Sequence, residues 1–403
     1  MSSGRAVESF LRTPSLRWLI VFRVLNALMV STYFNPDEYW QGPEVAHYMV
    51  FGYGHLTWEW KQRAQLRGVA HTLFFAVPFK LLAVLGMDSP TLIAYTPRVV
   101  QGVIAGVGDY YTHRLGLKLF GPKAASWTLF CSIFSWFHFF CSVRTFSNSI
   151  ESVLTVISLC HWPMLNGNRP AEYANALLFA GLAVVVRPTS AVVWVFVGVV
   201  DLMTTMDTWA KRWSLCATLV MPMVIITLGI SVVLDRWFYG EWTCVLYNFL
   251  EFNVFKGLDK LYGTHPWYWY FLEGFTTVLG VYTPFLIFGF KEAWRVPTAP
   301  CRTRALGWTI MWALVVYSFG GHKEFRFVLP LLPMALVYCG YTMHLLHTKQ
   351  SLLAWGQRSV FAIVGVNVIM AGYLSFAHQR SPVTVMNYLR NEAADPNTAR
   401  PVG

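Results

Sequence analysis

Long apolar stretches recur along the whole chain and are separated by short polar breaks. An α-helix needs about 17 to 25 mostly apolar residues to cross a bilayer core. The pattern predicts about eleven membrane-spanning helices, near residues 18–34, 91–111, 124–143, 147–163, 174–187, 189–204, 215–235, 268–290, 305–320, 328–347 and 359–377. We therefore expect an all-α, polytopic membrane protein with a single membrane-embedded domain over residues 1–403.

One further apolar stretch, residues 68–87, does not fit the series. It contains Pro78 and Lys80, and counting it as a full span would disturb the alternation of charge in the loops that follow. We expect this stretch to be re-entrant or to lie in the membrane interface.

Charged residues are scarce and are placed in the breaks. The chain is 55% hydrophobic and 13% charged, with a formal net charge of +11. The Lys and Arg residues do not gather on one face, as a nucleic-acid site would require, and indicate topology instead. Because positive loops stay in the cytoplasm, residues 1–17 are expected there. The opposite side, the lumen of the endoplasmic reticulum in a eukaryotic cell, receives residues 35–67, 236–267 and 321–327 and the polar tail 378–403.

The segment after the first span holds the most chemical character. Asn35-Pro-Asp-Glu-Tyr-Trp-Gln is followed by Tyr53-Gly-His-Leu-Thr-Trp-Glu-Trp. The adjacent carboxylates Asp37 and Glu38 stand where low dielectric and nearby charges can adapt a group to general-base catalysis. The aromatic residues suit a sugar ring, although an interfacial aromatic belt with solvated acids is the alternative.

A second ionisable cluster, His322-Lys-Glu-Phe-Arg-Phe, lies between two apolar stretches. Four ionisable groups within five residues are costly at a membrane boundary and usually mark function. His322, Lys323 and Arg326 can hold a phosphate by charge-assisted hydrogen bonds, with Glu324 orienting one of them. A loop whose charges reach toward lipid head groups is the alternative.

Three weaker motifs accompany these two. Tyr262-Gly-Thr-His-Pro-Trp precedes a span, and its unusual member is His265 before Pro266. Arg144-Thr-Phe-Ser-Asn and Arg187-Pro-Thr-Ser each place an arginine at a membrane boundary, where it needs a partner. For both arginines a structural ion pair and a substrate contact remain open.

Several motifs are absent from the sequence. There is no Asp-x-Asp pair, no Walker-type loop, no Gly-x-Gly-x-x-Gly motif and no His-Glu-x-x-His motif. The seven cysteines are scattered without metal-type spacing. We therefore expect neither a metal nor any other cofactor.

Taken together, these motifs resemble those of the dolichol-phosphate-mannose-dependent mannosyltransferases, glycosyltransferase family 22. The matching elements run in the family's order from residue 35 to residue 327. Their wording is most similar to the branch that adds the third mannose to the glycosylphosphatidylinositol (GPI) anchor precursor. The resemblance implies a membrane fold of the GT-C type, with luminal loops forming the active site.

The resemblance also implies substrates and roles. The donor would be dolichyl-phosphate mannose, the acceptor a mannosylated glucosaminyl-phosphatidylinositol, and the transfer inverting, α-1,2 and metal-independent. Asp37 would be the base, with Glu38 as its rival, and Glu324 an orienting group. His322, Lys323, Arg326 and Arg67 would hold the donor phosphate, with Arg63 as the alternative to Arg67. The acceptor would contact Tyr39, Trp58, Glu59, Trp60, His265 and Trp267.

Other functions are weighed against this one. A sister enzyme of the family would extend the N-glycan precursor or add a fourth mannose to the anchor. A transporter would place ionisable groups deep in several spans and often carries an internal repeat, whereas no repeat is detected here. A purely structural subunit gives no reason for clustering acids with cations.

Overall fold

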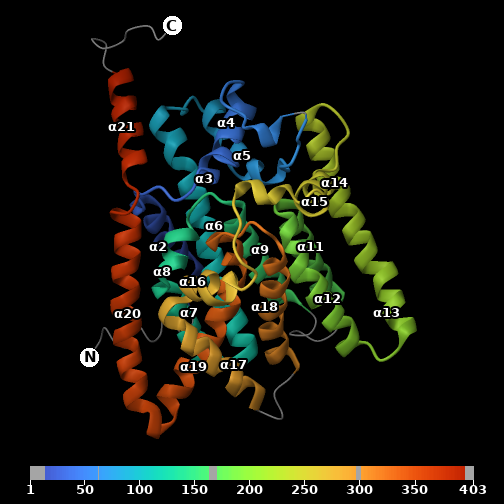
Figure 1. Ribbon diagram of the computed structural model, residues 1–403, viewed down its shortest axis with the longest axis vertical. Coiled ribbons are helices and arrows are strands. Elements are labelled where there is room, and N and C mark those ends of the chain that lie inside the picture. The colour runs from blue at the N-terminus through green and yellow to red at the C-terminus, as the bar shows by residue number, and fades with distance from the viewer. Residues whose placement is uncertain (1–13, 62, 163–169, 296–300, 395–403) are drawn as a thin grey trace.

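The computed structural model describes residues 14–61, 63–162, 170–295 and 301–394 (Figure 1). The expected cytosolic segment 1–17 and the end of the tail lie largely outside these ranges. Helices make up most of the described chain, and no strand occurs in it. The longer helices are α2 (Leu16–Met29), α4 (Pro43–Phe51), α5 (Ala70–Val84), α6 (Pro90–Phe120), α7 (Pro122–Phe134), α9 (Ser147–His161), α11 (Pro170–Val186), α12 (Ala191–Thr205), α14 (Met221–Tyr239), α17 (Thr283–Arg295), α18 (Cys301–Phe319), α19 (Leu332–Thr348), α20 (Leu353–Phe376) and α21 (Ser381–Ala394).

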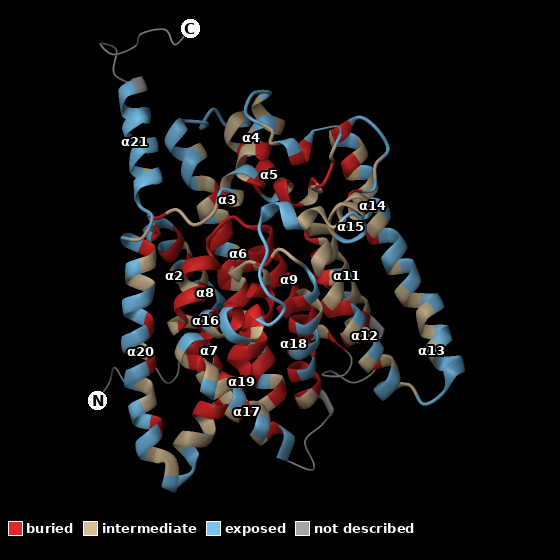
Figure 2. Ribbon diagram, viewed as in Figure 1, coloured by how far each residue is buried: buried red, intermediate tan, exposed pale blue. Residues whose placement is uncertain are grey.

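The centre of the bundle is formed by α9 and α19. Every residue from Ser147 to Cys160 is buried, as are Leu332 to Gly340 at the start of α19. The helices α6, α7, α11, α17 and α18 pack around these two. Figure 2 shows this buried centre within a shell of exposed helices. Helices that are apolar all round are expected inside a large bundle.

The first helix is joined to α6 by close packing and by charge. A side chain in place of Gly106 would come within 2.6 Å of the backbone of Ile20, so only glycine permits this approach. Arg23 of α2 donates to both oxygens of Asp109 of α6, at 2.6 and 3.0 Å, and both side chains are fully buried. This buried ion pair holds α2 against α6.

The outer helices present apolar side chains. Four helical stretches in the described chain are long and apolar enough to cross a membrane: Trp209–Tyr239, Tyr270–Arg295, Phe325–Thr348 and Gln350–Glu392. The first and last of these are mostly exposed, as expected for surfaces that contact lipid. The expected number of eleven spans remains a prediction.

Several predicted boundaries are wrong. The span predicted over 18–34 ends at Met29, because the following residues are extended and bond to the end of α20, with Ser31 donating to Ser375 and Tyr33 to Gln379. The span over 124–143 breaks at Ser135, whose hydroxyl caps the short helix α8 (Trp136–Cys141). The span predicted over 268–290, in contrast, falls within the continuous helical stretch Tyr270–Arg295, in which Gly280 (φ +54°) marks a local 3-10 turn.

Two other segments were incompletely predicted. The stretch 68–87 forms the 15-residue helix α5, which lies beside α4 at the top of Figure 1. The tail expected to be merely polar forms α21, with Val385, Met386 and Leu389 exposed.

The polar segments that carry the motifs gather at one end of the bundle. Figure 1 shows α3 (Asp37–Trp40), α4, α5 and α15 (Val245–Leu250) together at the top. Long-range bonds confirm the proximity, because Gln65 donates to Glu241 at 2.5 Å and Asn248 donates to the Gln65 carbonyl at 3.1 Å. The fold thus brings loops separated by about half the chain into one region.

Candidate active site

The short helix α3 presents the two adjacent acids. Pro36 stands at its N-terminal cap, and the Asn35 side chain accepts a hydrogen bond of 3.0 Å from the backbone N–H of Asp37. This turn is a usual role of Asn before a helix. The two acids then diverge, since Glu38 is buried whereas the Asp37 side chain keeps 24% of its surface exposed.

Asp37 meets the second cluster directly. The Arg326 Nη2 atom donates to Asp37 Oδ2 at 2.5 Å and to Glu324 Oε1 at 2.7 Å, and its Nε donates to Glu324 Oε2 at 2.7 Å. Asn35 also donates to Glu324 Oε2, at 3.2 Å. The two segments predicted to cooperate, 289 residues apart, therefore form one site.

Electrostatics at this cluster are set by Glu324. Burial alone would raise its pKa, but hydrogen bonds from His322 and Arg326 lower it to about 2. Arg326 is buried, and both of its bonds to Glu324 join it to that carboxylate. Glu324 is thus an anion that accepts two hydrogen bonds from Arg326, and its orienting role stays a prediction.

Glu38 has a different partner. Arg144 Nη1 donates to Glu38 Oε2 at 2.7 Å, and both side chains are buried. Arg144 also donates to Thr32 and to the Phe140 carbonyl. Of the two possibilities left open for Arg144, the structure shows the ion pair. Because Glu38 is held in this buried ion pair, Asp37 is the better candidate of the two acids for the general base.

A third ion pair lies in the first loop. Arg67 donates to both oxygens of Glu59, at 2.8 and 3.2 Å, while Gln41 and Tyr262 donate to the same carboxylate at 3.4 and 3.3 Å. Arg63 is exposed, so Arg67 is the arginine at the site. Because both oxygens of Glu59 are engaged, its role is to hold Arg67, and direct contact with an acceptor is not favoured.

The aromatic residues of the first loop divide into two groups. Tyr39 stacks on Tyr33 with ring centroids 6.2 Å apart, and Trp58 stacks on Tyr262 at 6.4 Å. Both Tyr39 and Trp58 remain accessible. Trp60, in contrast, is only 3% exposed and packs edge-on against Phe238. Trp60 is a buried residue that also lines the cavity described below, so the structure does not favour its predicted contact with the acceptor.

Lys323 also differs from the prediction. Its ammonium is buried and donates to the backbone carbonyls of His265, at 3.0 Å, and Gly320, at 2.5 Å. These bonds occupy the group that was predicted to hold a phosphate. Lys323 therefore fastens one loop to another.

Of the predicted site residues His322, His265 and Trp267, only the first lies beside Glu324. His322 lies at the site, with Nε2 3.0 Å from Glu324 Oε1 and Nδ1 3.3 Å from the Gly263 carbonyl. His265 stacks on Trp269 at 4.6 Å, on the outer surface. Trp267 is 70% exposed and contacts neither acid of α3. Both fit a surface at the membrane interface at least as well as an acceptor site.

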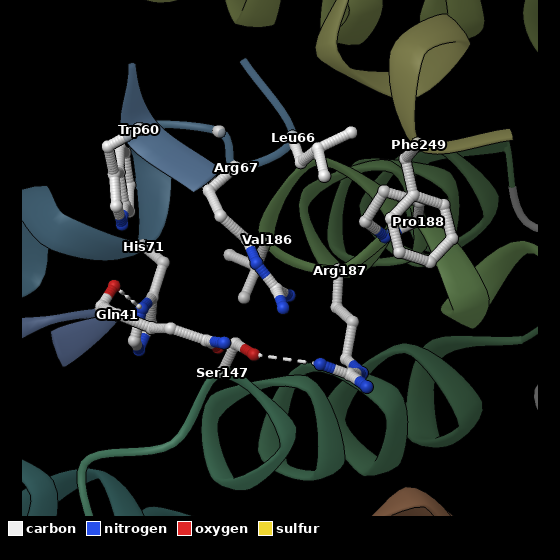
Figure 3. Close-up of a pocket in the computed structure, with 11 residues that line it drawn as sticks. Gln41, Trp60, Leu66, Arg67, His71, Ser147, Val186, Arg187, Pro188 and Phe249 are labelled. Atoms are coloured by element: carbon white, nitrogen blue, oxygen red, sulfur yellow. Dashed lines mark hydrogen bonds between the residues drawn. The ribbon is translucent and has the colours of Figure 1, made fainter. Parts of the chain in front are cut away.

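A cavity beside these ion pairs is lined by Arg187, for which the sequence did not decide between a structural ion pair and a substrate contact. The cavity is small, with a volume of about 30 Å³, and Arg67 and Arg187 both line it. Figure 3 shows the Arg67 guanidinium pointing down beside Val186 toward Ser147 and Arg187, whose own guanidinium lies beyond Ser147. Arg187 Nη1 donates to Ser147 Oγ at 3.2 Å.

Comparison with known proteins identifies the family. The chain is 40% identical over 396 residues to the mannosyltransferase APTG1 of Arabidopsis thaliana, an alignment that covers 93% of this chain and 70% of the relative. It is 39% identical to GPI alpha-1,2-mannosyltransferase 3 of Bos taurus, over 96% of this chain and 68% of the relative. The human protein of that name is 38% identical, over 93% and 64%. The chain thus spans about two thirds of the length of these relatives.

Solved structures confirm a fold of the GT-C type. ArnT from Cupriavidus metallidurans, bound to undecaprenyl phosphate, superimposes with a TM-score of 0.67 at 12% identity, covering 96% of this chain and 81% of that one. The oligosaccharyltransferase of Archaeoglobus fulgidus in its apo form gives 0.56 at 11% identity, covering 97% and 59%. The model of the Alg9-like mannosyltransferase family matches residues 16–402. This chain is therefore a membrane-embedded mannosyltransferase and belongs to the Alg9-like family.

Proposed function

We propose that this chain transfers mannose in α-1,2 linkage from dolichyl-phosphate mannose to a GPI-anchor precursor. The acceptor would be a mannosylated glucosaminyl-phosphatidylinositol, and the reaction would take place on the luminal side of the endoplasmic reticulum membrane. The names of the animal relatives support this acceptor, and the family supports a mannosyl donor.

The observation that carries the proposed chemistry is the state of Asp37. Both oxygens of Glu324 and of Glu59 accept hydrogen bonds, and Glu38 is buried against Arg144. Asp37 engages Arg326 through Oδ2 alone, and its Oδ1 accepts no hydrogen bond from a described residue. A general base needs an accessible oxygen within hydrogen-bond reach of the reacting hydroxyl, and the partial exposure of Asp37 supports this assignment.

The reaction balances with one base. The acceptor hydroxyl oxygen attacks C1 of mannose from the face opposite the phosphate, and its proton passes to Asp37. The bond between C1 and the phosphate oxygen breaks, and its electron pair stays on the phosphate, which gains one negative charge. A single displacement of this kind inverts the configuration at C1, by analogy with inverting glycosidases.

The test is transfer by the purified full chain from dolichyl-phosphate mannose. Asp37→Asn should lower kcat by at least about a hundredfold, the usual contribution of a general base. The matched control is Asp207→Asn, which changes an exposed aspartate outside the site. Near-normal transfer by a folded Asp37→Asn protein would refute the assignment.

The acceptor is tested separately. Lipid acceptors bearing two or three GPI mannoses, and an N-glycan precursor, are offered in parallel to the wild-type chain. Transfer to the two-mannose GPI lipid alone is the expected result. Preference for either of the others would assign the chain to a sister activity of the same family.

A further inference from the structure

Two arginine side chains, Arg67 and Arg187, line the cavity, and they differ in how fully their hydrogen-bond donors are paired. Arg67 is bound in bidentate fashion by Glu59. Burial alone would lower the pKa of Arg67, but the Glu59 charge and hydrogen bonds raise it. Glu59 therefore keeps Arg67 charged and in place, while part of its guanidinium still faces the cavity (Figure 3).

Arg187 is much less well satisfied. It is only 7% exposed, and its side chain makes one hydrogen bond to a described residue, the neutral hydroxyl of Ser147. Arg187 forms a buried ion pair with Glu151, whose Oε2 atom lies 3.5 Å from Nε, but no hydrogen bond joins the two groups. A guanidinium has five N–H donors, and a buried cation with unfilled donors is costly. An anionic ligand in the cavity would supply the missing acceptors.

The walls of the cavity narrow the class of that anion. Gln41 and Ser147 give it polar positions beside the arginines. Most of the remaining lining is apolar and consists of Trp60, Leu66, Val186, Pro188 and Phe249. Paired guanidinium groups favour phosphate, and an apolar wall favours a phosphate that carries a hydrocarbon chain.

The cavity also adjoins the proposed base. Gln41, which lines the cavity, ends the turn that begins at Asp37 and donates its backbone N–H to the Asp37 carbonyl. Phe327 lies between Arg187 of the cavity and Arg326 of the Asp37 cluster. Its ring centroid is 4.9 Å from the Arg187 guanidinium carbon and 5.6 Å from that of Arg326. A phosphate bound here would therefore lie next to the sugar-transfer site.

We infer that Arg67 and Arg187 form the seat for the phosphate of a polyprenyl phosphate, the group that leaves when mannose is transferred. This inference rests on the proposed function. It replaces the predicted phosphate site at His322 and Lys323, and it leaves Arg326 to Asp37 and Glu324. Arg187 and Ser147 are added to the residues that contact the donor, and Glu59 positions Arg67.

The experiment measures binding of a short polyprenyl monophosphate to the purified full chain, independently of transfer. Arg187→Gln should weaken binding by about tenfold or more, the usual effect of losing one charge-assisted contact, and Ser147→Ala should weaken it less. Arg212→Gln is the control for net charge, because Arg212 bonds to carbonyls at the end of α12, outside the cavity. Thermal unfolding of each variant shows whether it is folded.

Two further ligands test the class of anion. The corresponding polyprenol, without phosphate, should bind much more weakly than the monophosphate, and inorganic phosphate should compete only at far higher concentration. Inorganic phosphate that binds as tightly as the lipid would overturn the lipid assignment. If Arg187→Gln misfolds, Arg187→Lys replaces it and should keep the charge but lose affinity, because lysine cannot reproduce the planar contact.

The possible failures are distinguishable. Wild-type affinity in a folded Arg187→Gln protein, while the wild type transfers mannose to the GPI acceptor, would overturn the cavity assignment alone. Loss of lipid-phosphate binding in that variant, with no transfer by the wild type to any GPI acceptor, would overturn the proposed function and keep the cavity. In the kinetics, Arg187→Gln should raise KM for the donor and leave KM for the acceptor unchanged.

Discussion

The pairing of Glu38 with Arg144 makes a prediction that separates the two adjacent acids. In Glu38→Gln, Arg144 keeps its bonds to Thr32 and Phe140 but loses its only carboxylate. Removing one partner of a buried ion pair costs about 3 to 5 kcal/mol. Glutamine retains the volume and one oxygen acceptor, so we expect the lower end, about 3 kcal/mol. That corresponds to roughly two powers of ten in the ratio of folded to unfolded protein.

Asp37→Asn should behave in the opposite way. Asp37 is partly exposed, and Arg326 retains both of its bonds to Glu324 when Asp37 is neutralised. Because buried Arg326 keeps the Glu324 carboxylate as its partner, no unpaired buried cation is left, so the unfolding temperature of Asp37→Asn should stay near that of the wild type. Its kcat should nevertheless fall sharply. One acid therefore controls stability and the other controls the rate.

The assay records thermal unfolding of detergent-purified protein by tryptophan fluorescence, alongside transfer rates below the unfolding temperature. A double-mutant cycle with Arg144→Met isolates the pair energy. The reasoning fails if Glu38→Gln unfolds like the wild type and loses as much kcat as Asp37→Asn. Glu38 would then be the base.

Three further outcomes are expected. Trp60→Ala should cost about 3 to 5 kcal/mol of stability, as for other buried aromatic residues, and an unchanged KM for the acceptor would confirm that it is a core residue. Lys323→Met should speed protease cleavage around His265, because the ammonium fastens that loop, and should raise KM for the donor less than Arg187→Gln does. Glu324 has a pKa lowered to about 2, so its stabilisation is present above its ordinary pKa near 4.5 and lost as pH falls toward 2. The difference in unfolding temperature between wild type and Glu324→Gln should hence stay constant from pH 5 to 8 and shrink below about pH 4.

Sequence was sufficient for the class of fold and for the segments that meet. Span-length apolar runs and the side assigned to each loop placed residues 35–67 and 321–327 in one region, and the Asp37–Arg326 bond agrees. The break at Ser135 and the local 3-10 turn at Gly280 could not be predicted, because both lie inside runs whose composition remains apolar. A capping hydroxyl and a positive φ produce these irregularities without changing hydropathy.

The sequence also could not show which cationic side chains are already paired within the protein. Lys323, for example, donates to backbone carbonyls, which every residue provides whatever its type. Nor could it separate Arg144 from Arg187, which stand in similar boundary motifs. The difference lies in the partner: Arg144 has a carboxylate at 2.7 Å, whereas the nearest carboxylate to Arg187 is at 3.5 Å without a hydrogen bond.

The arrangement of charges constrains where the sugar can lie. An inverting displacement needs the base and the leaving phosphate on opposite faces of the mannose ring. Asp37 stands at one end of the turn that closes at Gln41, and the cavity with Arg67 and Arg187 begins at Gln41. A mannose between Asp37 Oδ1 and that cavity would have the base on one side and the cations on the other. A single cluster in which Arg326 both touched the base and held the phosphate would put them on the same side, so the geometry of inversion favours two separate groups of cations.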